Sequence, residues 1–404
     1  MNRWPVEAQL LEAVNLTKAL NLDVKNSWIL PLRRITSAKL IGSGHIDRIL
    51  RSIKEHQPTL VVFNCRLSAI QQRNLERALK VKVIDRTGLI LEIFADRART
   101  REGVLQVELA HLTWAQSRLV RSWTHLERQR GGYGFLGGPG ESQIEIDRRL
   151  IRKRINKIKR ELANVVRTRD LHRKNRKKVP YPIVSLVGYT NAGKSTLFNR
   201  LTGADVPAMD MLFATLDPSL RMMMLAGRKV LLSDTVGFIS DLPHELIAAF
   251  RATLEEVVEA DLVLHICDAA SPNYEAQQKD VTRILHDLGI KPDKICMVMN
   301  KIDLPGTDSI RTNSKNLCVS AHTGEGCNNL LQLIADRLSE DHLLCAATIP
   351  VQEGEPIAWL HAHGDVVQTQ HDDTAITVTL RLSQAMYQRF LGTYPQYDLT
   401  TLSD

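Results

Sequence analysis

The stretch that most constrains the fold is IVSLVGYTNAGKSTLFNRL, residues 183–201, where an apolar run meets a helix-forming run through a short loop. The loop has the spacing Gly-x-x-x-x-Gly-Lys-Ser, which between a strand and a helix wraps phosphate groups with backbone N–H donors. We therefore predict an α/β domain with a parallel sheet and a phosphate-binding loop. The loop residues expected to contact a nucleotide are Gly188, Tyr189, Thr190, Asn191, Ala192, Gly193, Lys194 and Ser195.

Two side chains of this loop have specific chemical roles in the prediction. The Lys194 ammonium is expected to bridge the outer phosphates as a catalytic group, and the Ser195 hydroxyl is expected to bind Mg²⁺. Downstream, the segment FATLDP places Thr215 where a second hydroxyl ligand for Mg²⁺ and a further catalytic group is expected. Its neighbours expected to line the nucleotide are Phe213, Ala214, Leu216 and Asp217.

A second phosphate segment, DTVGFIS, follows the apolar run VLLS. We expect Asp234 to hold the Mg²⁺ shell through water and the catalytic Gly237 N–H to meet the γ-phosphate. The nucleotide-contacting residues predicted here are Asp234, Thr235, Val236 and Gly237. The next residue is Phe238, at a position where a water-orienting Gln is typical of GTPases. Water must then be oriented by the backbone, a partner or the substrate phosphate, and we expect slow intrinsic hydrolysis.

The base is predicted from Asn300-Lys301-Ile302-Asp303, which ends an apolar run. A buried Asp303 carboxylate would accept N1–H and N2–H of guanine, a pattern that adenine cannot satisfy. The Lys301 stem is expected to stack along the base. The segment Ser320-Ala321-His322 is expected to offer a backbone N–H to the guanine O6. The pattern therefore predicts a GTP- and GDP-binding domain.

The N-terminal half alternates short apolar runs with helical patterns, which predicts a small parallel sheet. The expected strands are WILPL, TLVVF and VKVID, at residues 28–32, 59–63 and 81–85. Beyond it, two apolar stripes at helical spacing predict an antiparallel helix pair, joined by the loop 131–142 and followed by a linker at 171–180. The predicted parts are an α/β subdomain, a helical hairpin, a Ras-like domain and a small α+β domain, at residues 1–96, 97–178, 179–340 and 341–404.

Charge is concentrated in the second predicted helix. Between Arg148 and Lys178 there are fifteen Lys or Arg residues against two acids. Such a block favours a polyanion, either nucleic acid or an anionic membrane, although many charged helices are only solvated faces. The neighbouring loop GGYGFLGGPGES carries Tyr133 and Phe135. It is equally compatible with a flexible hinge and with an aromatic probe that enters nucleic acid.

Other features limit the class of protein. The six cysteines form no Cys-x-x-Cys pair, so neither a zinc ribbon nor a redox motif is expected. The segment MNRWPVEAQLLEAVNL lacks the pattern of a signal peptide, and no apolar run approaches the roughly 18 residues that span a bilayer. We therefore expect a cytoplasmic protein without a membrane span, and we expect it to be a monomer.

Taken in order, GYTNAGKSTLFNRL, FATLDP, DTVGFI, LPHELIAAFRATLEEV and NKID resemble the HflX family of ribosome-associated GTPases. The resemblance extends to IDRTGLILEIFADRARTREGVLQVELAHL and GPGESQIEIDRRLIRKRI, and so covers roughly residues 30–340. It implies a GTPase whose N-terminal domain binds the large ribosomal subunit and which, in several members, separates the subunits under stress. It also implies ATP binding by the N-terminal domain and a hydrophobic residue at the position of Phe238.

The chain departs from the family pattern at three places. The glycine loop is one residue longer and has Leu136 where a basic residue is common. Gly42-Ser43-Gly44-His45 replaces a frequent GxGK, and Asn64-Cys65 replaces an acidic pair. The expected function is a slow GTPase, stimulated by the ribosome, that splits or rescues stalled ribosomes. The alternatives are a ribosome assembly GTPase and an RNA-binding switch whose hydrolysis only resets affinity.

Overall fold

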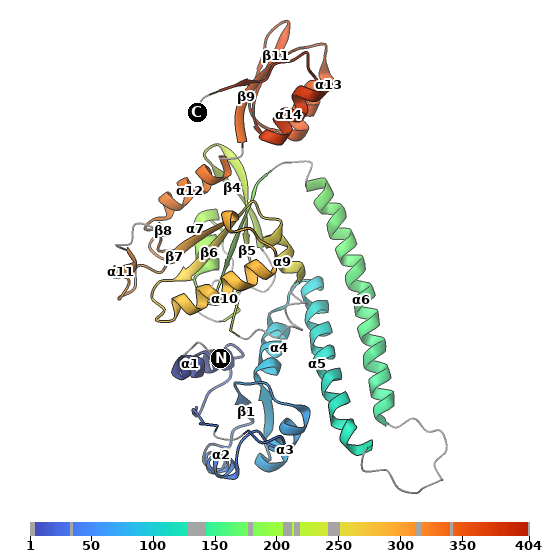
Figure 1. Ribbon diagram of the computed structural model, residues 1–404, viewed down its shortest axis with the longest axis vertical. Helices are drawn as coiled ribbons and strands as arrows, with labels where there is room; N and C mark the ends of the chain where they lie inside the picture. The colour runs from blue at the N-terminus through green and yellow to red at the C-terminus, as the bar shows by residue number, and fades with distance from the viewer. Residues whose placement is uncertain are drawn as a thin grey trace.

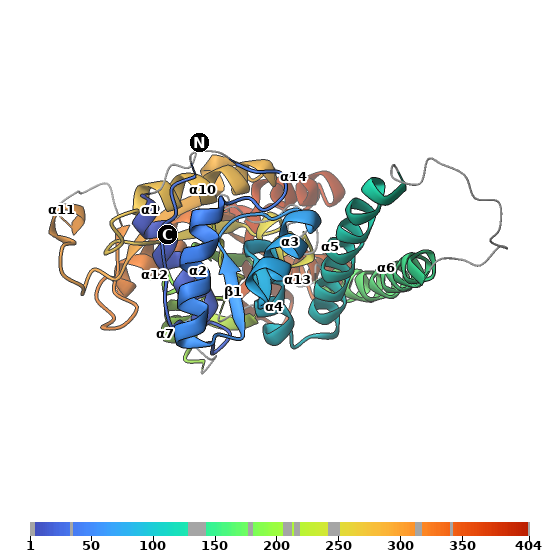
Figure 2. The same ribbon diagram turned by 90° about the horizontal axis from the view of Figure 1, so that it is seen from below.

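The computed structural model describes residues 5–32, 35–127, 143–176, 181–204, 212–213, 219–240, 251–311, 317–339 and 342–402. Along its longest axis, the N-terminal part lies at one end, a central sheet in the middle and the C-terminal part at the other end (Figure 1). A pair of long helices runs beside the first two parts and stands out from them when the molecule is seen from below (Figure 2). Across these described ranges, no helix combines the length and the apolar character needed to cross a membrane.

The N-terminal part packs helices around a two-stranded parallel sheet. Its elements are α1 Val6–Lys18, α2 Ser43–His56, β1 Leu60–Phe63, α3 Ala69–Leu79, β2 Lys82–Asp85 and α4 Arg86–Arg97. The predicted strand at 28–32 is wrong, because this segment has no regular secondary structure. Trp28 and Leu30 pack on the core while Ile29 is exposed, so the residues alternate as in a strand. However, no strand in the described part of the chain pairs with them, and Pro31 has no N–H to contribute to a ladder.

The two long helices confirm the predicted hairpin-like pair. They are α5 Arg101–Glu127 and α6 Gln143–Arg176, which run antiparallel to each other (Figure 1). Ile155 and Ile158 of α6 are buried, and the Arg154 guanidinium donates two hydrogen bonds to Glu108 of α5 at 2.7 and 2.8 Å. Residues 171–176, expected to be linker, are helical instead. No Gly or Pro occurs in α6, so nothing in its sequence interrupts the helix before Arg176.

Asp85 joins the helix pair to the N-terminal part. Its carboxylate caps α4 by accepting the Gly88 N–H at 2.9 Å and also accepts the Leu67 N–H at 3.1 Å. The same carboxylate forms an ion pair with Arg118 of α5 at 2.5 Å, and the Arg118 guanidinium lies 4.0 Å from the Trp114 ring centre. Only 1% of Asp85 is exposed. This one buried carboxylate therefore caps the start of α4 and also joins α5 to the N-terminal part.

The central part is a six-stranded sheet covered by helices on both faces. Its strands are β3 Ile183–Gly188, β4 Ser219–Leu225, β5 Arg228–Asp234, β6 Leu262–Asp268, β7 Ile295–Asn300 and β8 Leu317–Cys318. The order is β4-β5-β3-β6-β7-β8, and only the β4–β5 pair is antiparallel. The surrounding helices are α7 Lys194–Thr202, α9 Arg251–Val258, α10 Tyr274–Asp287, η1 Pro292–Lys294, α11 Asp308–Arg311 and α12 Cys327–Ser339. The carboxyl ends of parallel strands meet at one edge, where such sheets bind ligands.

The C-terminal part is a small α+β unit with a core of its own. Its elements are β9 His342–Pro350, α13 Gly354–His363, β10 Asp365–His371, β11 Ala375–Ser383, α14 Gln384–Thr393 and β12 Thr400–Thr401. The antiparallel order is β10-β11-β9-β12, and Phe390 of α14 is fully buried against Val378 and Leu380 of β11. The predicted fold class is confirmed: an α/β chain with a helical middle region, a phosphate-loop domain and a C-terminal antiparallel sheet.

Replacing Asp85 with Asn should lower the free energy of unfolding by about 3 kcal/mol, because Arg118 would lose a buried ionic partner. Asp96→Asn, which removes a mostly exposed carboxylate beside Arg97, is the matched control and should change it by less than about 1 kcal/mol. The measurement is urea unfolding followed by circular dichroism. Equal losses in the two variants would contradict an anchoring role for Asp85.

Candidate functional site

The phosphate-binding loop is held by close backbone packing at its two glycines. Gly188 ends β3, and a Cβ placed there would lie 2.2 Å from the Ile266 carbonyl oxygen of β6. Gly193 has φ +88°, and its Cβ would lie 2.2 Å from Asn300 Nδ2. Neither position can carry a side chain unless the Ile266 backbone or the Asn300 side chain moves. The loop therefore lies directly against β6 and the end of β7.

Lys194 begins α7 inside this loop. Its Nζ donates to the Tyr189 carbonyl oxygen at 2.9 Å, and 6% of the residue is exposed. Burial lowers the Lys194 pKa to about 8; Asp234 opposes this shift and Lys301 adds to it. A buried ammonium beside backbone donors is suited to phosphate groups, whose charge favours its protonated form.

Ser195 and Asp234 bring two oxygen groups together across the site. The Ser195 hydroxyl donates to Asp234 Oδ2 at 2.7 Å, and Asp234 is fully buried at the end of β5. A hydroxyl beside a carboxylate is a donor set that suits Mg²⁺. Within the described ranges, no group of three or more His, Cys, Asp or Glu residues could hold a metal. A magnesium ion here would thus depend on phosphate oxygens and water for its other ligands, as is usual for this ion.

The turn from Asp234 to Gly237 is paired with the phosphate-binding loop. The Phe238 N–H donates to the Gly188 carbonyl oxygen at 3.0 Å, and the Thr190 N–H donates to the Phe238 carbonyl oxygen at 2.7 Å. A Cβ on Gly237 would lie 2.8 Å from Thr190 Cα and 3.0 Å from Lys194 Nζ. The two phosphate segments are therefore in van der Waals contact.

Phe238 is a packing residue. It is 4% exposed and belongs to a buried cluster that includes Tyr189, Phe213 and Ile239. Its side chain thus contributes to the core at the position where a Gln would face the phosphate. The Thr190 hydroxyl nearby is buried and has no hydrogen-bond partner among the residues that the structure describes. A buried hydroxyl of this kind is able to bind phosphate or water.

The segment expected to bind the base contains Asn300 and Asp303. Asn300 is buried; its Nδ2 donates to the Ala192 carbonyl oxygen at 2.8 Å, and its Oδ1 accepts the Ala321 N–H at 2.9 Å. Without a bound base, Asp303 is exposed on the turn that follows β7. The Ser320 hydroxyl donates to Asp303 Oδ1 at 2.7 Å, and this bond is the main reason why the Asp303 pKa is lowered. Discrimination against adenine would then require the bound base to desolvate Asp303.

Most of the predicted site residues converge on the carboxyl edge of the central sheet. The loop 188–195, the turn 234–237 and the segments 300–303 and 320–322 follow β3, β5, β7 and β8 in turn. Phe213 shares a buried cluster with Tyr189 and Phe238, and its ring packs edge-on against Phe94 of α4, with ring centres 4.6 Å apart. Residues 214–217, including Thr215, and the glycine loop 131–142 lie outside the described residues.

Two residues that no sequence pattern singles out contact this site from the N-terminal part. Glu12 of α1 accepts a hydrogen bond from the Tyr189 hydroxyl, and Arg86 donates to the carbonyl oxygen of Ser240. Glu12 lies 177 residues before Tyr189 in the chain, and Arg86 lies 154 residues before Ser240. Glu12 belongs to no recognisable motif, and Arg86 lies in the IDRTGL segment without a role that the sequence predicts. Only the tertiary structure reveals the contacts.

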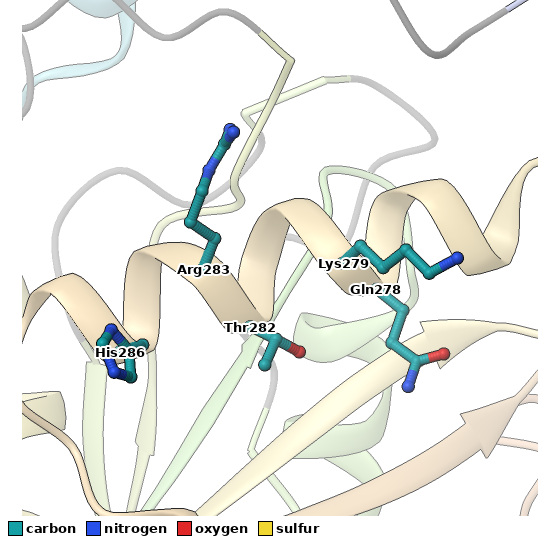
Figure 3. A pocket seen from close by; sticks show the side chains of 5 residues that line it. All are labelled: Gln278, Lys279, Thr282, Arg283 and His286. Atoms are coloured by element: carbon teal, nitrogen blue, oxygen red, sulfur yellow. The ribbon is translucent and has the colours of Figure 1, made fainter.

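A separate surface concavity lies on α10. It is lined by Gln278, Lys279, Thr282, Arg283 and His286 (Figure 3). All five side chains come from one helix, α10 Tyr274–Asp287. None belongs to the phosphate or base segments, and this concavity is not the nucleotide site.

A parallel sheet with GxxxxGKS after β3, DxxG after β5 and NKxD after β7 defines a P-loop GTPase. Four family profiles match successive parts of the chain. The matches are "GTP-binding GTPase N-terminal" at residues 7–95, "GTP-binding GTPase Middle Region" at 97–176, "50S ribosome-binding GTPase" at 183–301 and "HflX C-terminal domain" at 307–399.

Individual relatives agree with these profiles. The chain is 49% identical over 386 residues to the GTPase HflX of Magnetococcus marinus, covering 94% of this chain and 89% of the relative. It is also 49% identical over 321 residues to the GTPase HflX of Escherichia coli, covering 78% and 75%. A crystal structure of SsGBP with GDP aligns with a TM-score of 0.48 at 25% identity, covering 80% of this chain and 94% of that one. The chain belongs to the HflX family of GTPases.

The affinity for GDP should fall about threefold between pH 7.5 and pH 8.5. Lys194 has a pKa of about 8 in the free site. Phosphate binds the charged form, so at a pH above this value Lys194 must take up a proton when GDP binds. Calorimetry in buffers of different ionisation enthalpy measures this proton uptake. Lys194→Arg is the control, because a guanidinium stays charged throughout the range. An equal pH dependence in the two proteins would show that Lys194 is not the titrating group.

Proposed function

We propose that this GTPase binds the large ribosomal subunit through its helical pair and uses GTP binding to split or rescue stalled ribosomes. The observation that carries the proposal is the basic face of α6, in a chain that matches a ribosome-binding GTPase family. The exposed cations of this face include Arg148, Arg152, Lys153, Lys159 and Arg160. Ribosomal RNA is a polyanion that such a face attracts through counterion release.

Not every cation of α6 is equally available for RNA. Arg154 forms its two hydrogen bonds with Glu108 of α5, so its charge is compensated within the helix pair. Arg152 and Lys159 are exposed and seven residues apart, which places them on the same side of the helix two turns from each other. These two residues are therefore suitable for testing RNA binding without disturbing the contact between α5 and α6.

In the proposed reaction, Lys194 and the Gly237 N–H bind the γ-phosphate, while Ser195, together with Thr215, would hold Mg²⁺. When bound, the ion would neutralise charge on the phosphate oxygens. Because Phe238 is buried in the core, the attacking water must be oriented by the backbone, the docked ribosome or the phosphate itself. Intrinsic turnover is then slow and rises on the ribosome, where a docked partner supplies the missing orientation.

The remaining parts of the proposal concern the base and the whole chain. Asp303 is proposed to bind the guanine N1–H and N2–H, with Lys301 along the base and the Ala321 region at O6. Lys301 Nζ lies 2.7 Å from Asp268 Oδ2, which fixes its stem beside this position. We further propose that the chain divides into parts at residues 96, 178 and 340 and that the N-terminal part binds ATP. We also propose that the protein is monomeric and cytoplasmic.

Asp303→Asn should lower GTP affinity by at least tenfold and raise affinity for xanthosine triphosphate, because an amide donates where xanthine presents a carbonyl. The measurement is a competition assay with a fluorescent nucleotide. Asp308→Asn, a nearby exposed acid in α11, is the control and should keep the wild-type preference. Unchanged GTP affinity in the Asp303 variant would remove this residue from base recognition.

Sedimentation of intact ribosomes tests the ribosomal role. The protein with a non-hydrolysable GTP analogue should convert the intact-ribosome peak into separate subunits, and the GDP form should not. Arg152→Ala/Lys159→Ala should weaken binding to the large subunit. It should also reduce the slope of log affinity against log salt by about 1.4 to 1.8, from roughly 0.7–0.9 per lost contact.

A matched charge change provides the control. Lys279→Ala/Lys291→Ala removes two exposed cations from the central part and should leave the salt slope unchanged. An undiminished intact-ribosome peak at saturating protein would reject splitting and favour an assembly factor. A wild-type salt slope in the α6 variant would mean that its charges are merely solvated.

A further inference from the structure

A buried polar cluster connects the N-terminal part to both phosphate segments. At its centre, the Glu12 carboxylate of α1 accepts hydrogen bonds from the Tyr189 hydroxyl at 2.5 Å and the Ser240 hydroxyl at 2.7 Å. Glu12 Oε2 also accepts a hydrogen bond from Arg86 at 2.7 Å. Arg86 lies at the start of α4, so two elements of the N-terminal part contribute to the cluster.

Additional bonds close the cluster into a ring. Arg86 donates to the carbonyl oxygen and the hydroxyl of Ser240, each at 2.9 Å, and to Asn64 Oδ1 at 2.6 Å. The Ser240 N–H donates to the Tyr189 hydroxyl at 2.5 Å. Tyr189 therefore accepts from Ser240 and donates to Glu12. Asn64, one of the departures from the family pattern, supplies the outer contact of the Arg86 guanidinium.

The cluster is buried, so its polar groups depend on one another for hydrogen bonds. Glu12 is 8% exposed, Arg86 is 6% exposed and Tyr189 is 5% exposed. Burial, and then the Glu12 carboxylate, raise the Tyr189 pKa well above its usual value, which keeps the hydroxyl a donor. Burying a charge is tolerated when it is paired and hydrogen-bonded, as Glu12 and Arg86 are here.

Each partner in the central part lies close to a phosphate-binding group. Tyr189 is inside the phosphate-binding loop, and its carbonyl oxygen accepts the hydrogen bond from Lys194 Nζ. Ser240 is three residues beyond Gly237, the residue whose N–H is proposed to meet the γ-phosphate. Between them, Phe238 pairs with the loop through the bonds to Gly188 and Thr190. A shift of the turn relative to the loop would therefore change the distance between Tyr189 and Ser240.

We infer that Glu12 and Arg86 are positioning residues for the phosphate site, which hold Tyr189 and Ser240 and thereby set the spacing between the phosphate-binding loop and the Asp234–Gly237 turn. The N-terminal part thus takes part in distinguishing GTP from GDP. The coupling is reciprocal, because whatever changes this spacing must also change the placement of α1. This inference rests on the proposed contact between the Gly237 N–H and the γ-phosphate, and it requires neither RNA nor a ribosome.

The test compares affinities for GDP and for a non-hydrolysable GTP analogue in the full chain. GDP lacks the γ-phosphate, so the ratio of the two affinities reports on the position of the turn. Tyr189→Phe removes only the hydroxyl and should lower the preference for the GTP analogue by roughly two- to tenfold. Glu12→Gln should act in the same direction, and the double variant should match the stronger single variant, because both changes remove the same link.

Two chemically identical changes outside the cluster serve as controls. Tyr274→Phe removes a hydroxyl from α10, and Glu7→Gln changes an exposed carboxylate of α1 five residues before Glu12. Both should keep the wild-type ratio. If Glu12→Gln fails to fold, Tyr189→Phe still provides the test, because it leaves the Glu12–Arg86 ion pair intact.

Hydrogen exchange of the α1 amides gives a second readout. In the wild-type protein, α1 should exchange at different rates with GDP and with the GTP analogue, and Tyr189→Phe should remove this difference. A merely structural cluster would lower the unfolding temperature of the variants and leave their affinity ratio at the wild-type value. That result, or identical α1 exchange with the two nucleotides in the wild-type protein, would overturn the inference.

Discussion

The close approach of the phosphate-binding loop to its neighbours is the constraint on which the rest of the structure depends. Gly188 lies against the β6 backbone and Gly193 against Asn300, so the loop is fixed by contacts that a single methyl group would prevent. Asn300 extends this constraint, because its amide binds both Ala192 and Ala321. The phosphate end and the base end of the site are thereby held as one unit at the edge of the sheet.

The sequence was sufficient where function depends on short, ordered segments. The loop 188–195 and the turn 234–237 were predicted because backbone geometry and phosphate chemistry restrict which residues can occupy them. Prediction was wrong where the outcome depends on distant partners. Residues 28–32 alternate like a strand, but no strand among the described residues pairs with them. No local pattern could show that Phe213 would pack against Phe94 or that Glu12 would reach Tyr189.

Phe238 contributes to packing at a position where a polar side chain could have oriented water. Its side chain lies in the core between the central sheet and the N-terminal part, and its backbone pairs with the phosphate-binding loop. A polar residue here would have to be buried without a solvent contact, which is costly unless it finds a partner. The hydrophobic residue thus favours a stable junction between the parts, and the orientation of water is left to other groups.

The length of α6 has a mechanical consequence. With 34 residues, the helix spans about 50 Å, and its end at Arg176 leads toward β3 of the central sheet. Its partner α5 is instead anchored to the N-terminal part through Arg118 and Asp85. The two helices are therefore anchored to different parts of the molecule. For a helix about 50 Å long, a rotation of about 5° between those parts would displace the far end of α6 by about 4 Å. A movement too small to break the packing around the nucleotide would be amplified to the size of a nucleic-acid base at the distal end of the helix pair.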